Sequence, residues 1–385
     1  MKSRKYILTG GTGFLGSLLG VELLKSGHSV FFLGRGEGSD AHKSRQEDIL
    51  LKIDADVPLH KAHFFKVDFE KLELGLNKME QEYLKDADGF FHLAADLSFK
   101  PEHGTRVRKT NHENLLHVMS LSKKLEIRFF FVSTAYVHGS QSKNAHIPGA
   151  IFPRPFSFHN AYEESKYDAE IFIKDWSSKH NLKYTILRPS IIVDREGRTS
   201  TPFGFSSFLI GIEKLKHKFP RLMSGKFTPL LLPFPYSPCA RLNLVPADWV
   251  VHSIITIAEK NKQDGQIFNL VNPEPIPIKK IIVHAFEKGS GIRLFSFPAP
   301  DWFIQLFTFT IHLIGKIFKP LRILSERLWL FRFYVTETIL YARENTDRLL
   351  GETTNPIPTL SDNELYLVTK HFISHYNKKT RDINS

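Results

Sequence analysis

Cysteine is almost absent from this chain, since its 385 residues include only Cys239. A single cysteine excludes an internal disulfide and any metal site built from several cysteines, and it is typical of a reducing compartment. No uncharged apolar stretch reaches the roughly 18 residues that a membrane-spanning helix needs. Residues 1–10 show no signal region. We therefore expect a cytoplasmic protein without a bound metal.

Acidic residues are the scarcer charged class. Lysine and arginine number 52 against 40 aspartates and glutamates, which gives a formal net charge of +12. Such an excess fits an anionic partner, namely a phosphorylated cofactor, an acidic carrier protein, a membrane surface or nucleic acid, or else a merely solvated basic surface. No recognised nucleic-acid-binding module accompanies the charge, so we expect no nucleic-acid partner.

The first half of the chain alternates apolar strand patterns with helical patterns, which predicts a parallel sheet covered by helices on both faces. The fold class is α/β, a Rossmann-like doubly wound sheet with a smaller, mainly helical C-terminal region. The predicted strands are 5–9, 29–33, 63–67, 89–93, 128–133, 183–187 and 266–271, and the predicted helices are 14–25, 76–85, 106–124, 161–179 and 247–259. Three prolines predict an irregular loop over 231–240.

The first strand leads into a glycine-rich turn. Tyr6-Ile7-Leu8 is followed by Thr9-Gly10-Gly11-Thr12-Gly13-Phe14-Leu15-Gly16 and then by a helical pattern. Glycines in this position let the backbone turn tightly and approach a pyrophosphate, whose charge lies at the helix N-terminus. Because strand, turn and helix follow one another as required, the segment predicts a dinucleotide site.

The end of the second strand indicates which dinucleotide binds. NAD-specific sheets usually place an acidic residue there to bind the ribose 2′-hydroxyl. This chain has Leu33-Gly34-Arg35, and the next acid is Glu37. Since the guanidinium of Arg35 can pair with a 2′-phosphate, we expect NADPH rather than NADH.

Three residues predict the chemistry. Tyr162 and Lys166 lie four apart and therefore on one face of a helix. A neighbouring ammonium favours the phenolate and should lower the pKa of the tyrosine towards neutrality. Thr134 follows a strand, at the sheet edge where ligands of such folds bind. Its hydroxyl can hold a carbonyl oxygen while Tyr162 protonates it.

With these features the chain resembles an extended short-chain dehydrogenase/reductase, in its thioester-reductase and fatty acyl-CoA reductase branch, the male-sterility type. The resemblance covers roughly residues 1–271. The matching segments are Thr9–Gly16, Val67-Asp68, Leu74-Gly75-Leu76, His92-Leu93-Ala94-Ala95, Asn111, Ser133-Thr134-Ala135-Tyr136-Val137, Tyr162–Lys166 with Ala169-Glu170, Leu187-Arg188-Pro189-Ser190, and Asn243-Leu244-Val245-Pro246-Ala247-Asp248.

The resemblance implies roles for particular residues. Gly10, Gly13 and Gly16 would hold the pyrophosphate, Asp68 the adenine amino group, and Ala94 would line the path of the ribose. Lys166 would also hold the nicotinamide ribose. Pro189 and Ser190 would border the nicotinamide, and Asn111 would order the active site. An NADP-binding domain would span 1–195 and be completed by about 241–272, which leaves 196–240 and 273–385 for the substrate.

Two departures bear on the alternatives. Sugar-nucleotide dehydratases place acids after the catalytic threonine, whereas Ala135 and Tyr136 follow here, which disfavours dehydration. Arg241 stands where sugar-nucleotide epimerases carry a phosphate-binding arginine, which keeps an epimerase open, although a coenzyme A phosphate could use the same group. His92 and His138 could be extra acid–base groups, but packed histidines are the stronger interpretation.

The C-terminal part suggests contact with a lipid. Residues 302–315 are uncharged, with polar residues recurring every three or four positions, and Pro320 ends the predicted helix. Such a segment, here 302–335, can lie peripherally on a membrane, form a wall of an acyl-chain tunnel, or simply pack in the core.

The sequence therefore predicts NADPH-dependent reduction of an acyl thioester, either a fatty acyl-CoA or an acyl-carrier thioester, to an aldehyde and then to an alcohol if reduction continues. One alternative is another extended-family oxidoreductase or epimerase acting on a sterol-like alcohol or a sugar nucleotide. The other is a non-catalytic, cofactor-binding scaffold. Oligomeric state, chain length and carrier stay open.

Overall fold

A computed structural model of the chain describes residues 3–36, 39–140, 145–198, 205–218, 232–291, 294–354 and 359–384. Its largest element is a seven-stranded sheet in the order β12-β7-β5-β4-β1-β2-β3, in which all neighbouring strands are parallel. This confirms the predicted Rossmann-like sheet. The strands are β1 Lys5–Thr9, β2 Ser29–Gly34, β3 Ala62–Lys66, β4 Gly89–His92, β5 Phe129–Val132, β7 Tyr184–Pro189 and β12 Gln266–Leu270.

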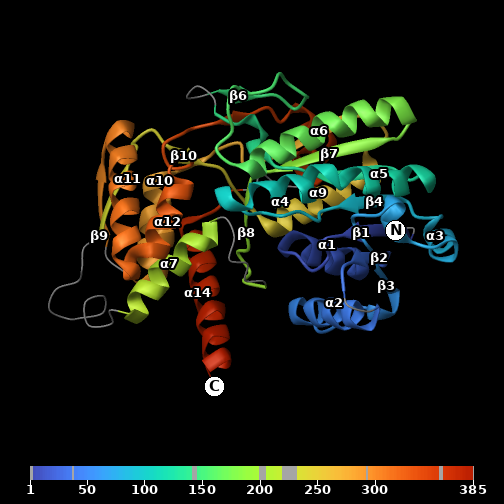
Figure 1. Cartoon of the computed structure of the whole chain (residues 1–385), viewed down its shortest axis with the longest axis horizontal. Coiled ribbons are helices and arrows are strands. Elements are labelled where there is room, and N and C mark those ends of the chain that lie inside the picture. Colours follow the sequence, from blue (N-terminus) through green and yellow to red (C-terminus); the bar gives the residue numbers. More distant parts are fainter. Residues whose placement is uncertain are drawn as a thin grey trace.

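Helices cover both faces of the sheet (Figure 1). Tyr6 and Leu8 of β1 pack in the cluster that contains α1 and α9, whereas Ile7, between them, packs in the cluster that contains α5 and α6. Side chains of a strand alternate between faces, so a strand apolar at every position must be covered twice. The helices are α1 Phe14–Lys25, α2 Ser39–Ile53, α3 Lys78–Leu84, α4 Gly104–Arg108, α5 Leu115–Lys124, α6 Ala161–His180 and α9 Ala247–Lys260.

The structure departs from the prediction in two details of this part, one helix that is divided and one that was not predicted. The helix expected over 106–124 is split into α4 and α5 by a wider helical turn, Lys109–Glu113, which contains Asn111. Helix α2 was not predicted, because its sequence is too polar to show an apolar stripe.

The second region is mainly helical and has its own apolar core. In Figure 1 its helices gather on the side of the sheet away from α3. They are α7 Phe205–Lys218, α10 Ile278–Ile281, α11 Asp301–Ile317, α12 Arg322–Phe331 and α14 Asp362–Asn384. Short strands complete the chain: β6 His146–Ile147, β8 Ile191–Val193, β9 Leu232–Tyr236, β10 Arg241–Leu242, β11 Leu244–Pro246, β13 Ile276–Pro277, β14 Leu294–Pro298 and β15 Leu340–Tyr341.

Strand β9 corrects the loop expected over 231–240. Although Pro233 and Pro235 lack an N–H group, Leu232–Tyr236 pairs in parallel with Leu294–Pro298. Prolines are tolerated in a strand with a single partner, because its outer edge donates no ladder hydrogen bonds. Residue 231 lies outside the described residues.

The end of the chain returns to the first sheet through α13, Glu344–Thr354. The Asn345 side chain donates to the carbonyl oxygens of Gly149 at 3.1 Å and Ile267 at 3.0 Å, and the Thr346 hydroxyl donates to that of Asn269 at 3.0 Å. These bonds tie the last part of the chain to strand β12. Among the described residues, no helix is long and apolar enough to cross a membrane.

Candidate active site

The turn between β1 and α1 is so tight that glycine is required. Gly10 has a φ of +76°, and a Cβ there would lie 2.6 Å from the Ala94 nitrogen. A Cβ on Gly16 would overlap the Gly10 carbonyl. The glycine turn, the start of α1 and the segment after β4 therefore meet with their backbones in contact at the edge of the sheet. The glycine pattern predicted such a tight turn.

The N-terminus of α1 fits the pyrophosphate of a dinucleotide. Gly13 caps this helix without a side-chain hydrogen bond, and its first turn, all of which the structure describes, contains no acid. The first N–H groups of a helix then carry uncompensated positive charge that attracts an anion. The residues present thus fit an NAD(P)-type cofactor, which would supply a hydride when bound.

A pocket of about 400 Å³ extends from this turn to the ends of the central strands. The residues that line it come from the first half of the chain, up to Gly197, and from the C-terminal part, between Phe331 and Phe372. Of the expected site residues it contains Gly10, Thr12, Gly13, Phe14, Leu15, Gly16, Arg35, Ala94, Thr134, Tyr162, Lys166, Pro189 and Ser190.

Asp68, expected to bind the adenine, does not line this pocket. Its side chain is half exposed, lies 3.7 Å from the Lys71 ammonium and accepts the Glu70 N–H at 3.0 Å. The neighbouring Phe69 lines the pocket instead. Arg35 lies at the pocket, as expected, whereas Glu37 falls outside the described residues.

Thr134, Tyr162 and Lys166 meet in the pocket. Thr134 ends β5 and begins a short helical turn, where its hydroxyl accepts the Tyr136 N–H at 3.3 Å. A hydrogen bond joins the side chains of Tyr162 and Thr134. The Lys166 ammonium donates to the Val132 carbonyl at 2.8 Å and lies 4.5 Å from the centre of the Phe131 ring.

The charge states differ from expectation. Burial, together with the charge of Glu163, raises the pKa of Tyr162, although the bond to Thr134 opposes the rise. The prediction that Lys166 would lower this pKa was therefore wrong. Burial lowers the pKa of Lys166 to about 7, and the charge of Glu170 opposes the decrease. Tyr162 consequently keeps its proton at neutral pH and can act as an acid.

Asn111 connects the pocket loop to helix α6. Its side-chain oxygen accepts the Asp96 N–H at 2.7 Å, and its amide donates to the Asp96 carbonyl and to the Ser165 hydroxyl, both at 3.0 Å. It is 1% exposed. The wider turn between α4 and α5 carries this side chain, which holds the loop after β4 against the helix of Tyr162.

A buried ion pair fixes the strand end that carries Pro189 and Ser190. Arg188 and Glu170 are each 1% exposed, and the guanidinium Nε lies 2.9 Å from a carboxylate oxygen. Arg188 also donates to the carbonyl oxygens of Pro148 and Ala150. Both charged side chains are thus hydrogen-bonded, as charged groups buried away from water need to be.

Sequence reasoning missed a polar cluster beside Tyr162. Glu163 is fully buried and accepts hydrogen bonds from Tyr334 and from the ring and backbone N–H groups of His159, at 3.0 and 3.1 Å. Asn160 donates to the Tyr334 oxygen at 3.0 Å. No sequence signal links Tyr334 to Glu163, because 171 positions separate them.

Ser133 is a second missed residue. Its hydroxyl is buried in the pocket wall and has no hydrogen-bond partner among the described residues. An unpaired buried hydroxyl is costly unless a ligand or water satisfies it. The only feature of the sequence that could have indicated this residue is its position next to Thr134.

Three residues considered above as a phosphate-binding group or as extra acid–base groups do not line this pocket. Arg241 is exposed on β10 and does not line the pocket. His92 is bonded to the Thr9 hydroxyl at 2.8 Å, and burial lowers its pKa to about 3. His138 is bonded to the Gly139 carbonyl and the Tyr341 hydroxyl. Both are packed histidines. Within the described chain, no group of three His, Cys, Asp or Glu residues is placed to hold a metal.

The family described as male sterility protein, with an NAD-binding domain, matches residues 8–254 of this chain. This range contains the glycine turn, Thr134, Tyr162 and Lys166. The chain belongs to this family. It is thereby an extended short-chain dehydrogenase/reductase, a class of oxidoreductases with a Rossmann NAD-binding domain.

The curated proteins that this chain resembles are of more than one kind. It is 24% identical over 215 residues to fatty acyl-CoA reductase 1 of Xenopus laevis, covering 51% of this chain and 41% of that protein. It is 26% identical over 216 residues to UDP-glucuronic acid decarboxylase 2 of Arabidopsis thaliana, covering 52% and 43%. The chain thus spans less than half the length of these curated relatives.

Among solved structures, the terminal R domain from the myxalamid PKS-NRPS biosynthetic pathway matches the whole chain. The TM-score is 0.76 at 21% identity, with 99% of this chain and 92% of that domain covered. The likeness therefore extends through the helical region after residue 272, where the sequence alone offered no trustworthy match. At this identity it shows a shared fold.

Proposed function

We propose that the protein reduces an acyl thioester, a fatty acyl-CoA or an acyl-carrier thioester, to an aldehyde with NADPH as the reductant. The observation that carries the proposal is that two pockets lie side by side. Ile191, Phe331 and Tyr334 line both the pocket of Tyr162 and a second, apolar cavity. The apolar cavity thus borders the place beside Tyr162 where the reactive carbonyl would lie, and it is the nearest apolar space for the acyl chain attached to that carbonyl.

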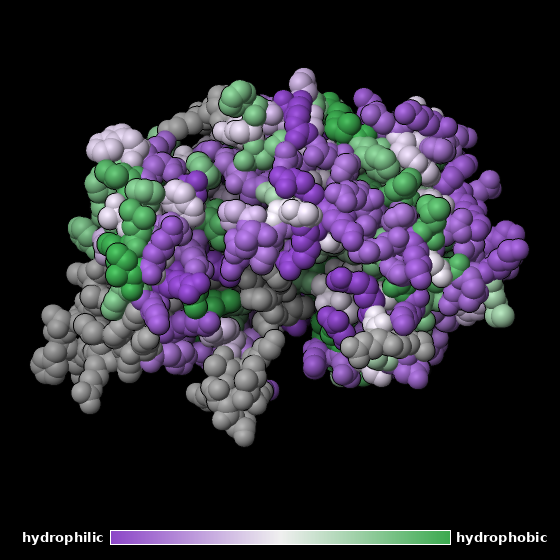
Figure 2. All heavy atoms as spheres, in the orientation of Figure 1, coloured by the Kyte–Doolittle hydropathy of each residue, from purple (hydrophilic) through white to green (hydrophobic). Residues whose placement is uncertain are grey.

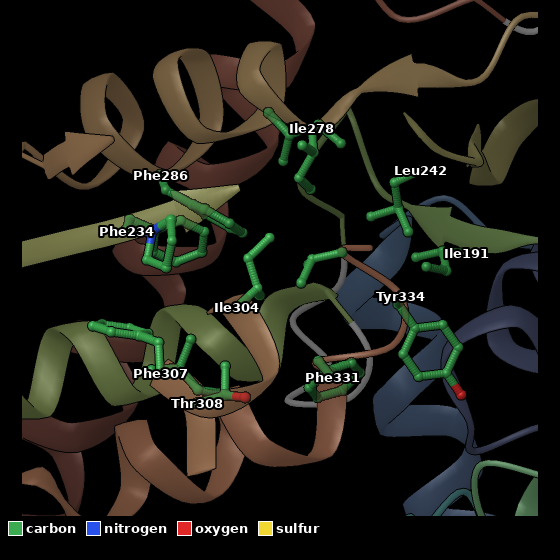
Figure 3. Close-up of a pocket in the computed structure, with 14 residues that line it drawn as sticks. Ile191, Phe234, Leu242, Ile278, Phe286, Ile304, Phe307, Thr308, Phe331 and Tyr334 are labelled. Carbon is green, nitrogen blue, oxygen red and sulfur yellow. The ribbon is translucent and has the colours of Figure 1, made fainter. Parts of the chain in front are cut away.

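The second cavity lies inside the helical region (Figure 3). Ile191, Phe331 and Tyr334 lie at one end, and Phe234, Phe286 and Phe307 lie at the other. Its polar side chains among the described residues are Tyr334, whose hydroxyl bonds to Glu163, and Thr308, whose hydroxyl bonds to the Gln305 carbonyl at 3.0 Å. The surface left for a ligand is therefore apolar, which suits an acyl chain rather than a sugar.

The chain's own groups supply the acid and the orientation. Thr134 and Tyr162 bond to the carbonyl oxygen, where negative charge develops as hydride adds to the carbon. Tyr162 gives its proton to that oxygen, which is possible because its raised pKa keeps it protonated. The resulting hemithioacetal loses its sulfur substituent as a thiol when the C–S bond breaks and the C=O bond re-forms. Lys166, which lines the same pocket, would hold the nicotinamide ribose.

The preference for NADPH belongs to the same proposal. Arg35 is an exposed cation at the pocket edge after β2, where it can pair with a 2′-phosphate. We also propose that residues 1–195 with about 241–272 bind the cofactor, that 196–240 and 273–385 bind the substrate, and that the protein is cytoplasmic and touches a membrane peripherally.

The test is consumption of NADPH by the purified protein with palmitoyl-CoA, with NADH and hexadecanal as parallel reactions. Removing a general acid lowers the rate by about 10²- to 10⁴-fold, so we expect the turnover of Tyr162→Phe to fall by that factor. Its affinity for NADPH, measured by nicotinamide fluorescence, should stay unchanged.

Other results would favour a competitor. Tight binding of NADPH without turnover on any thioester would contradict the proposal and favour a scaffold. Binding and turnover of a UDP-sugar would favour the decarboxylase-like relatives, although Arg241 does not line the pocket, which argues against that substrate class.

A further inference from the structure

Helix α11 carries large apolar side chains on its outer face. Exposed positions recur every three or four residues, as on one face of a helix, and are Trp302, Leu306, Phe309, Leu313 and Ile317. Each is between 43% and 87% exposed. Figure 2 shows hydrophobic residues gathered over this helix.

This outer face of α11 is unusual within the molecule. Sixteen large apolar residues of the described chain are exposed, and eight of them fall between positions 295 and 318. They are Phe295, Trp302, Leu306, Phe309, Leu313, Ile314, Ile317 and Phe318. Single exposed apolar residues are normal, but a contiguous group marks a surface that another body covers.

The fold holds this helix firmly from its inner side. Ile304 is 1% exposed, and a Cβ on Gly315 would overlap the Ser325 side chain, so α11 and α12 cross in close contact. Phe303 packs on Phe297 of β14, with ring centres 6.1 Å apart. The outer side chains therefore have no freedom to turn inwards, and something outside must bury them.

The charges around the face identify the kind of partner. Residues 302–335 contain five basic residues and one acid, Glu326, which is paired with Arg322 at 3.0 Å. Lys316 is exposed and shares the helical face of Leu306 and Leu313, and Lys319 is exposed just beyond the helix. A stripe with tryptophan at one end and lysines at the other fits an apolar layer bordered by anionic headgroups.

We propose that the outer face of α11, with Phe295 beside it, docks on the surface of a bilayer that contains anionic lipid. The helix lies in the plane of the interface, with its leucines and aromatic rings at the hydrocarbon boundary and with Lys316 and Lys319 among the phosphates. This docking is inferred from the exposed apolar side chains and the neighbouring lysines, and it does not depend on the proposed reductase activity.

A consequence of the docking concerns the substrate. Ile304, Phe307 and Thr308, on the inner face of α11, line the apolar cavity. One helix thus separates the bilayer from the cavity, so acyl thioesters would be taken up where they accumulate. This consequence rests on the proposed function.

The experiment is flotation of the full chain with vesicles of phosphatidylcholine, with and without phosphatidylserine. We expect binding that increases with phosphatidylserine and weakens with salt, because salt screens the attraction between lysines and headgroups. Leu306→Gln/Leu313→Gln should lower the partition coefficient by about tenfold or more, because two apolar side chains leave the interface. Lys316→Glu/Lys319→Glu should remove the dependence on phosphatidylserine.

The matched control is Leu72→Gln/Met79→Gln, which replaces two apolar residues near α3 that are even more exposed than Leu306 and Leu313 and should leave flotation unchanged. A soluble butyryl thioester reports whether each variant keeps its fold and its turnover.

The outcomes separate the two proposals. Wild-type protein that oxidises NADPH but never floats overturns the docking and leaves the reductase. Flotation without any turnover overturns the reductase and leaves the docking. A dimer in light scattering that Leu306→Gln/Leu313→Gln dissociates assigns the face to a second copy and overturns the docking on lipid.

Discussion

At the scale of single residues, the site holds charged groups under opposing constraints. Lys166 is 2% exposed, and its pKa falls to about 7 because burial penalises the ammonium. Glu163, next to Tyr162, stays buried because three hydrogen bonds satisfy its carboxylate. The protonation states of Tyr162, which keeps its proton, and of Lys166, which readily loses one, are therefore set by burial and neighbouring charges. The residue types alone do not determine them.

His159 gives a test of this environment. Burial lowers its pKa, but contacts with Glu163 at 3.0 Å and Glu337 at 3.4 Å outweigh burial and raise it to about 9. A folded-state pKa above the unfolded value stabilises the protein below the unfolded pKa, near 6.5, and the contribution is lost as pH rises through about 9.

We therefore expect His159→Gln to lower the free energy of unfolding most below pH 6.5 and least above pH 9. Between these values the difference should shrink by at most about 1.4 kcal/mol per pH unit. Urea unfolding of both proteins across pH measures it, and taking the difference cancels the titration of Lys166. A difference that stays constant with pH would show that the imidazole is uncharged in the folded protein.

At the scale of elements, α11 has two apolar faces with different surroundings. Ile304 is buried beside the cavity, whereas Leu306, two positions later, is 55% exposed. Because positions two apart lie on opposite sides of a helix, one sequence run serves both surfaces. A sequence stripe cannot tell these two roles apart.

The inner face of α11 makes a prediction about chain length. Ile304→Phe adds a ring to a narrow apolar cavity, so it should raise KM for palmitoyl-CoA by about tenfold, the effect of losing roughly two buried methylenes. The increase for butyryl-CoA should be smaller. Steady-state kinetics with both substrates measure it, with the volume-conserving Ile304→Leu as the control. Equal losses on both substrates would mean that the chain does not enter this cavity.

At the scale of the whole molecule, the two regions are interlocked. Tyr334 bonds to Glu163, α13 bonds to β12, and Arg195 bridges Asp248 and Glu364 at 2.5 and 2.7 Å. Each link joins the sheet region to a part of the chain after residue 330. Separating the regions would leave buried polar groups unpaired.

We therefore expect a single calorimetric unfolding transition for the full chain. NADPH at about a hundredfold excess over its Kd should stabilise the whole protein by about 2.7 kcal/mol, because it binds only the folded state. Differential scanning calorimetry with and without NADPH measures both. Two transitions, of which NADPH moves only one, would show that the regions unfold independently.

Local patterns in the sequence were sufficient for much of the first region. Lys5–Thr9 and Phe14–Lys25 have the predicted bounds, because strand, glycine turn and helix depend on near neighbours and on the backbone freedom of Gly10. The helix over 106–124 was predicted as continuous because nothing local marks the wider turn at Asn111. That turn exists to bring one amide to Asp96 and Ser165.

The sequence by itself determined the parallel sheet and the tight glycine turn after β1, because both follow from local patterns of apolar residues and glycines. It also predicted Thr134, Tyr162 and Lys166 as a set, and the structure brings these three residues to one pocket. Only the tertiary structure decided the direction of the Tyr162 pKa, the exclusion of Asp68 and Arg241 from the pocket, and the apolar cavity behind Tyr334. These properties depend on burial and on contacts between distant parts of the chain, such as Glu163 with Tyr334. Packing creates such contacts, and no local pattern encodes them.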